Sequence, residues 1–188
     1  MTNIYIGIDN GSTGSVGIIS SPSQQVAFFP VPIKTVPNYT KEVQMIGRIH
    51  LTELKKEILG RIPVGDEYSI RCLIERPFMA PVESIIDQNG KKVPSVNMIF
   101  LKSSLNAHRS FEAIIILMES MKIGYEVVDS KAWQKEMLGN GIKGSKALKE
   151  ASKIKGIQMF PQFEDVINKH KDADGLLIAC FAQKYYNQ

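Results

Sequence analysis

Four carboxylates stand at positions where an acid is uncommon in a folded chain. Asp9 and Glu75 each end an apolar run typical of a buried strand, and Asp172 and Asp174 open a strongly apolar run typical of a helix. A buried carboxylate must be paired, hydrogen-bonded or metal-bound, because removing an isolated ion from water costs many kcal/mol. The simpler interpretations are that Asp9 closes the following turn through its own backbone and that Asp172 is an N-cap.

Acids that gather at one place raise each other's pKa, so they cannot all stay ionised without cations. Mg²⁺ suits such a site because it prefers oxygen ligands and keeps several of its own waters. Two such ions about 4 Å apart can activate a water molecule and stabilise the leaving oxygen of a phosphodiester. The chemistry that these four acids indicate is therefore metal-assisted hydrolysis, provided that the fold brings them together.

The elements that must position these acids follow from hydrophobic periodicity and from glycine and proline punctuation. The segment 30–40 is predicted to be a loop or an extended crossing, and 160–171 to be a loop with one helical turn. The segment 79–94 is predicted to be a loop with a small hairpin around Asn89-Gly90. The pattern predicts strands at 4–9, 16–19, 24–29, 70–75 and 125–128, and helices at 43–59, 95–122, 131–138, 145–155 and 172–186, with Ser95, Ser130 and Ser145 as caps. This order indicates a mixed α/β layer fold.

The composition fits one globular domain. The chain has 188 residues, of which 44% are hydrophobic and 22% charged, and a domain of this length needs no disulfide or structural metal to fold. Cys72 and Cys180 both lie in apolar runs, so we expect reduced, buried thiols and a cytoplasmic location. The apolar run 113–118 is too short to cross a bilayer, and we expect no signal peptide before the first strand.

The positive charge is concentrated in one segment. The chain carries a net charge of +4, and residues 131–155 alone contain seven Lys and two Glu, which gives +5. Such a segment is either a solvated face or a surface that contacts a polyanion.

Three blocks of the sequence resemble the active-site blocks of RuvC-type Holliday-junction resolvases. They are Gly7-Ile8-Asp9-Asn10-Gly11, Ile74-Glu75-Arg76-Pro77-Phe78 and Asp172-Ala173-Asp174-Gly175-Leu176-Leu177-Ile178-Ala179, and they occur in the family's order with a long helix after the second block. The resemblance implies a ribonuclease-H-like fold with a central five-stranded mixed sheet flanked by helices, formed as a single nuclease domain over 1–188. It further implies a homodimer without membrane attachment, in a bacterial cell or a virus-infected host, that nicks four-way DNA junctions symmetrically with Mg²⁺ or Mn²⁺. A viral or mobile-element origin fits so divergent a member.

Transferred residue by residue, the resemblance makes Asp9, Glu75 and Asp174 metal ligands and catalytic residues. The sequence departs from the family at the third acid, because Lys171 stands three residues before Asp174. The resemblance then leaves Asp172 as the preferred ligand and His170 as the alternative. His170 otherwise belongs, with Lys169 and Lys171, to a basic collar that DNA could contact.

Other matches concern DNA. Phe78 stands where the family has an aromatic residue near the junction centre, although packing in the core is the alternative. The run Gly141-Ile142-Lys143-Gly144-Ser145-Lys146 resembles the family's glycine-and-lysine loop. The resemblance implies that Lys143, Lys146 and Lys149 contact phosphates and that Lys146 also stabilises charge on the cleaved phosphate.

Three competing interpretations stay open on the sequence alone. The run Asp9-Asn10-Gly11-Ser12-Thr13-Gly14-Ser15 also resembles the first phosphate loop of actin-like ATPases, but 188 residues leave no room for the second copy of the core that those proteins use. The chain could also be an inactive junction-binding protein. Finally, it could be a related nuclease that cuts other branched DNA, flaps or RNA–DNA hybrid.

Overall fold

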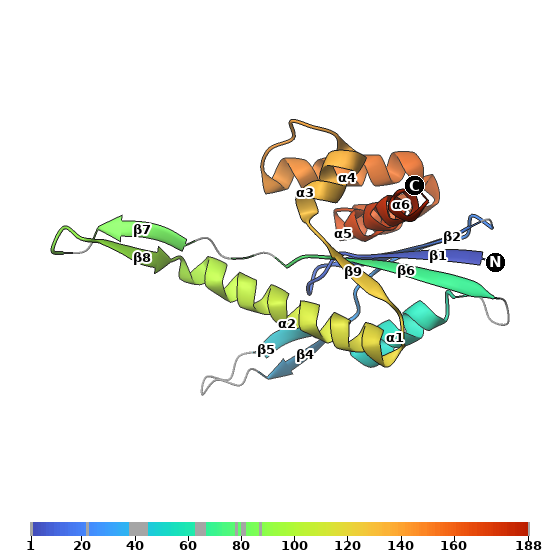
Figure 1. The fold of residues 1–188 in the computed structure, drawn as a ribbon, viewed down its shortest axis with the longest axis horizontal. Helices are drawn as coiled ribbons and strands as arrows, with labels where there is room; N and C mark the ends of the chain where they lie inside the picture. Colours follow the sequence, from blue (N-terminus) through green and yellow to red (C-terminus); the bar gives the residue numbers. More distant parts are fainter. Residues whose placement is uncertain are drawn as a thin grey trace.

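A central sheet of five strands organises the protein (Figure 1). The computed structural model describes residues 2–21, 23–37, 45–62, 67–77, 79, 82–86 and 88–187. The strand order is β3-β2-β1-β6-β9, with bounds β1 Thr2–Ile8, β2 Ser15–Ser21, β3 Val26–Pro30, β6 Tyr68–Glu75 and β9 Tyr125–Val128. Helices lie on both sides of this mixed sheet, so the predicted α/β class, with a central five-stranded mixed sheet flanked by helices, is confirmed.

Strand pairing explains how two of the four acids become neighbours. β1 pairs antiparallel with β2 and parallel with β6, with Ile8 opposite Ile74. The carboxyl ends of the parallel strands β1 and β6 therefore lie at one edge of the sheet, where Asp9 and Glu75 follow these partners directly. β9 is also parallel to β6 and places Val128 opposite Glu75.

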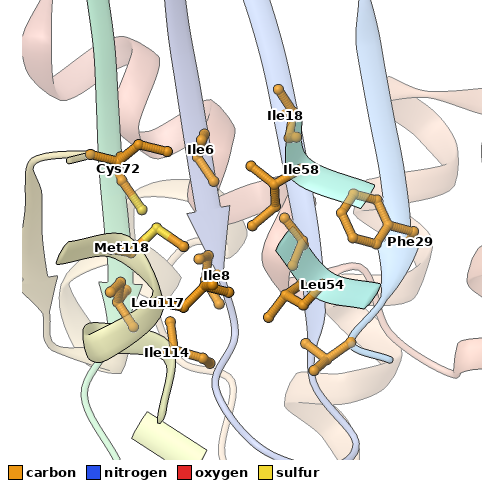
Figure 2. Close-up of a cluster of buried hydrophobic side chains, with 14 of the residues drawn as sticks. Ile6, Ile8, Ile18, Phe29, Leu54, Ile58, Cys72, Ile114, Leu117 and Met118 are labelled. Atoms are coloured by element: carbon orange, nitrogen blue, oxygen red, sulfur yellow. The ribbon is translucent and has the colours of Figure 1, made fainter. Parts of the chain in front are cut away.

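One face of the sheet is covered by α1 (Leu51–Leu59) and α2 (Met98–Ser120). Figure 2 shows the core between the sheet and these two helices, in which branched aliphatic side chains of the strands interdigitate with side chains of both helices. Its fully or almost fully buried members include Ile6, Ile8, Ile18, Leu54, Ile58, Cys72, Ile114 and Met118.

The opposite face is covered by α6 (Asp174–Tyr186), with α3 (Ser130–Leu138), α4 (Ser145–Met159), the 3₁₀ turn η1 (Pro161–Phe163) and α5 (Glu164–His170) beside it. α6 touches the strands through its backbone. A Cβ atom on Gly7 would lie 2.1 Å from the backbone nitrogen of Ala179, and one on Gly175 would lie 2.4 Å from the carbonyl oxygen of Ser15. Glycine at these two positions lets the amino end of α6 rest directly on β1 and β2, which carries Asp174 toward Asp9.

Residues 45–49 differ from the prediction. The loop or extended crossing predicted over 30–40 contains β4 (Ile33–Pro37), which pairs antiparallel with β5 (Met45–Ile49). The expected helix over 43–59 is therefore wrong in its first part, and α1 begins at Leu51, with His50 accepting a hydrogen bond from the backbone N–H of Glu53. The apolar residues of 45–49 fit either period, and pairing with β4 decides in favour of a strand.

The hairpin predicted around Asn89-Gly90 is confirmed. β7 (Val82–Ile86) pairs antiparallel with β8 (Lys92–Val96) as a separate two-stranded ribbon. It projects from the body beyond the amino end of α2 (Figure 1), and Val82 and Ile86 are exposed on it.

Several helix ends also differ from the prediction. α2 is capped by Asn97 rather than Ser95 and ends at Ser120, and α3 is capped by Asp129 rather than Ser130. Gly144 rather than Ser145 occupies the N-cap of α4, which continues to Met159. The helical turn expected within 160–171 is present and longer than expected, as η1 followed by α5. α6 begins at Asp174 instead of Asp172.

Two further expectations concern cysteines and membranes. Cys72 and Cys180 are free and buried, as predicted. Within the described ranges, every helix is either too short or too polar to cross a bilayer.

Candidate metal centre at the carboxyl edge of the sheet

Three acids from separate parts of the chain meet at the edge where β1 ends. Asp9 follows β1, Asp172 lies in the turn between α5 and α6, and Asp174 is the first residue of α6. One carboxylate oxygen of each lies within 4.8 Å of one oxygen of each of the others. The predicted convergence of these three acids is therefore present in the fold.

The amino end of α6 is held by two buried serines that the sequence analysis did not single out. Ser152 on α4 donates a hydrogen bond to Oδ1 of Asp174, and its Oγ accepts one from the backbone N–H of Ala173 at 3.1 Å. Oγ of Ser15 on β2 accepts a hydrogen bond from the backbone N–H of Gly175 at 3.0 Å. No local pattern marks Ser152, because it reaches Asp174 only through the packing of α4 against α6.

Glu75 lies beside this compact group, at the end of β6. Burial, followed by the charge of Asp174, raises the pKa of Glu75 to about 8. The indole of Trp133 is fully buried on α3. Its Nε1 makes no hydrogen bond of normal geometry among the described residues, yet it lies close enough to the Glu75 carboxylate to favour the charged form. Asn10 donates a hydrogen bond to the backbone carbonyl of Glu75 and so ties the loop after β1 to the end of β6.

Crowding and burial favour the protonated form of two acids in the compact group. Burial raises the pKa of Asp9 well above its usual range, and the charges of Glu75 and Asp174 add to this effect. Burial and then the charge of Asp172 raise the pKa of Asp174 to about 6. Protonation of these carboxylates is therefore easier than usual unless a cation offsets their repulsion.

Asp172 behaves differently because Lys149 and His170 already contact it. Its side chain is fully buried, which alone would raise its pKa, but contacts with His170 and Lys149 lower the pKa instead. Nζ of Lys149 lies 2.9 Å from Oδ2 of Asp172, and Nε2 of His170 lies 3.4 Å from Oδ1 without a hydrogen bond of normal geometry to any described residue. The His170 side chain is only 8% exposed and meets Phe28 edge-on. The expectation that His170 is available to DNA is therefore wrong.

The basic segment 131–155 lies next to the acids. An open cleft of about 670 Å³ runs between α3, α4 and the edge that carries the acids, and Glu75, Asp174 and Lys149 line it together with Lys131 and Lys135. Lys143 and Lys146 are exposed, but they do not line this cleft. The roles assigned to these lysines stay predictions. Phe78 lies outside the described residues.

The donor set fits Mg²⁺ or Mn²⁺. All the candidate ligand atoms are carboxylate oxygens, the kind of ligand that Mg²⁺ takes in proteins. Asp9, Asp172 and Asp174 offer these oxygens close together, and the raised pKa values of Asp9 and Asp174 reflect, beside burial, repulsion that a divalent cation would relieve.

Comparisons with solved structures connect this geometry to a known fold. The structure of Thermus thermophilus RuvC in complex with a Holliday junction substrate matches with a TM-score of 0.52 and 13% sequence identity, over 99% of this chain and 94% of that chain. A second T. thermophilus RuvC structure matches over 100% and 96% of the two chains, with 13% identity and a TM-score of 0.48. Neither a protein-family profile nor a curated protein sequence matches this chain. The resemblance to RuvC is thus confirmed as a shared fold.

Proposed function

We propose that this chain is a metal-dependent endodeoxyribonuclease that resolves four-way DNA junctions by paired, symmetric nicks. The observation that carries the proposal is the meeting of Asp9, Asp172 and Asp174 at the carboxyl edge of a RuvC-like sheet, with Glu75 beside them. Residues 1–188 would act as one nuclease domain.

Asp9, Glu75, Asp172 and Asp174 would hold one or two Mg²⁺ ions, and Mn²⁺ could replace them. Bound metal supplies an activated water and stabilisation of the leaving oxygen of the phosphodiester. The chain's own contribution is to fix the oxygen donors. Ser152 orients Asp174. Asn10 holds the end of β6 through the backbone carbonyl of Glu75, and the Trp133 indole lies beside the Glu75 carboxylate.

The DNA would enter through the cleft between α3 and α4. Lys131, Lys135 and Lys149 line this cleft, and they would contact phosphates on the path to the acids. Lys143, in the turn before α4, and Lys146, in the first turn of α4, would extend the basic surface. Lys146 is proposed as a catalytic residue that stabilises charge on the cleaved phosphate, and Phe78 as a residue that stacks on a base near the junction centre.

Paired nicks require two active sites, and we therefore propose a homodimer. α2 supports this, because Met98, Leu105 and Ile116 expose apolar side chains along it. Successive members of this set are seven and eleven residues apart, which places them on one side of a helix. A second copy of the chain would remove this apolar surface from water.

The test is cleavage of a labelled four-way junction, a Y-fork, an RNA–DNA hybrid and a linear duplex, each with and without Mg²⁺. We expect the four-way junction to be cut at symmetric positions only with metal. Asp9→Asn and Glu75→Gln should abolish cleavage while junction binding persists, because phosphate contacts carry the affinity. The matched control is Asp165→Asn, which neutralises an exposed acid on α5 and should cut at the normal rate.

Two outcomes would change the proposal. Full cleavage by Asp9→Asn or Glu75→Gln would end the metal-nuclease assignment. Cleavage of the Y-fork or the hybrid in preference to the four-way junction would keep the chemistry and change the substrate.

A further inference from the structure

A second cavity lies on the other side of the sheet from the cleft at α3 and α4. It has a volume of about 640 Å³ and lies between the β4–β5 hairpin, the first turn of α1 and the middle of α2, which are all on the lower side of the sheet in Figure 1. Its polar side chains come from Ser12 after β1, Lys34 and Arg48 of the hairpin, Thr52 of α1, and Asn106, Arg109 and Ser110 of α2.

The lining is strongly one-sided in charge. Lys34, Arg48 and Arg109 contribute three cations, and none of the described residues that line the cavity carries a carboxylate. The other polar side chains in the lining are hydroxyls and one amide, which can donate hydrogen bonds to an anion. Lys34 and Arg109 are exposed in the single chain. Arg109 lies seven residues before Ile116 and so close to the side of α2 proposed to meet a second copy, whereas Lys34 belongs to β4.

The backbone adds to this positive potential. Leu51 and Thr52 are the first two residues of α1, and the first N–H groups of a helix have no carbonyl partner within the helix. The amino end of a helix also carries a partial positive charge that favours anions. Glu53, in the same turn, does not line the cavity and pairs with Lys56 at 3.6 Å.

The cavity also reaches the loop that follows Asp9. Ser12, which is part of its lining, follows Asp9 by only three residues. The β4–β5 hairpin touches the same loop, since a Cβ on Gly47 would lie 3.9 Å from Cβ of Ser12. Two basic clefts, one on each face of the sheet, therefore border the edge that carries the acids.

We propose that this second cavity is a phosphate site that holds the backbone of the DNA substrate on the face opposite the α3–α4 cleft. If a DNA duplex crosses the carboxyl edge of the β-sheet, one DNA strand can lie toward the α3–α4 cleft while the other lies toward the cavity on the opposite face. The planar guanidinium of Arg109 suits the two-point binding of a phosphodiester, and Lys34 supplies a point charge. The inference rests on the proposed nuclease function and adds a second DNA contact to it.

The experiment compares two double variants that each remove two positive charges. Lys34→Gln with Arg109→Gln alters the cavity, and Lys55→Gln with Lys102→Gln alters exposed lysines of α1 and α2 that do not line it. Both are made in the Asp9→Asn background, so that junction binding can be measured without cleavage. Each lost phosphate contact should reduce the log–log salt slope by about 0.9, so the cavity variant should lose about 1.8 and the control should lose none.

Two further measurements distinguish a DNA contact from a subunit contact and from a site for free phosphate. The single variant Lys34→Gln leaves α2 intact and should still lower the slope by about 0.9, which excludes an effect through subunit contacts. A titration with inorganic phosphate tests whether the cavity takes a free anion instead. Phosphate binding that depends on Lys34 and Arg109, together with an unchanged junction slope, would overturn the DNA assignment.

Failure of this inference differs from failure of the proposed function. If the unmodified chain neither binds nor cuts the junction, the proposed function is wrong. If the unmodified chain cuts the junction, and the cavity variant binds it with an unchanged salt slope, then only the second phosphate site is wrong.

Discussion

Nζ of Lys149 lies 2.9 Å from Oδ2 of Asp172, so the fully buried acid of the cluster is already neutralised by a side chain. Partial burial of Lys149 works against its charge, but the bond to Asp172 raises the pKa of the ammonium group overall. The Lys149 side chain is half exposed and also lines the cleft toward Glu75 and Asp174. Lys149 is therefore placed to contact both the acids and a phosphate in the cleft.

Replacing Lys149 with Met should separate these two roles. We expect tighter Mg²⁺ binding, because a cation that competes for Asp172 is removed, and a cleavage rate about a hundredfold lower, because a charge close to the reacting phosphate is lost. Calorimetric Mg²⁺ titration and single-turnover cleavage measure these two effects. Lys146→Met, at an exposed position off the cleft, is the comparison variant: a loss of rate there would support the role proposed for Lys146, and a normal rate there would assign the charge stabilisation to Lys149 alone.

Asp172→Asn and His170→Ala test which residue completes the metal site. Asp172→Asn should lower the single-turnover rate at least about a hundredfold across a Mg²⁺ titration, as expected for loss of a ligand or positioned base. His170→Ala should instead lower the melting temperature, since His170 is buried against Phe28 and beside Asp172. If Asp172→Asn cleaves normally while a folded His170→Ala protein is inactive, the histidine is the functional residue.

Without bound metal, the free energy of unfolding of the protein should fall as the pH rises. The folded chain raises the pKa of Asp174 from 3.8 to about 6 and that of Glu75 from 4.5 to about 8. The folded state therefore binds protons more tightly than the unfolded state, and the stabilisation present below about pH 4 is lost progressively up to about pH 8.

Mg²⁺ should reverse this trend, because it binds the deprotonated acids and only in the folded state. Thermal unfolding in EDTA and in Mg²⁺, at about pH 5.5 and about pH 8.5, measures both effects. The increase in melting temperature on adding Mg²⁺ should be larger at the higher pH. In EDTA, Glu75→Gln should show a weaker pH dependence than the unmodified chain between these values. An identical pH dependence would show that Glu75 does not titrate in this range.

The close approach of α6 to β2 predicts a severe effect of one added methyl group. Gly175→Ala should destabilise the protein by about 3 kcal/mol or more, because the new Cβ would meet backbone atoms that cannot rotate away. Gly124→Ala is the matched control, since no described heavy atom lies within 4 Å of the position that its methyl group would take and its backbone is not left-handed. Denaturant unfolding measures both variants, and equal stability of the two would contradict the backbone packing of α6 on β2.

The sheet and the acid cluster could be predicted because their signals are local and repeated. The apolar runs of β1 and β6 are each followed by an acid. Parallel pairing of these strands, with Ile8 beside Ile74, brings the two acids to the same edge of the sheet. The residues that support the site could not be predicted in this way. Ser152 and Trp133 reach the acids from α4 and α3 only after the helices have packed, and neither has a distinctive neighbour in the sequence.

The errors arise where tertiary contacts outweigh local preference. Residues 45–49 form a strand because β4 is available to pair with them, although the same apolar residues also fit a helix. At the helix ends, Asn97 and Asp129 accept hydrogen bonds from the first turns of α2 and α3, although a serine stands near each of them. Serine is common enough at caps that the sequence alone does not distinguish these neighbours.

The backbone contact between α6 and the sheet has a consequence for the selection of ions by size. Gly7 and Gly175 leave no side chain between the helix and the strands, so main-chain contacts set how closely the backbone at Asp174 approaches the strands that carry Asp9. Ser152 in turn holds the Asp174 carboxylate. Oxygen ligands lie at about 2.0–2.1 Å from Mg²⁺ and at about 2.3–2.6 Å from Ca²⁺. A metal centre whose carboxylate oxygens are held at a fixed spacing would therefore distinguish these two ions by radius, even though both prefer oxygen ligands.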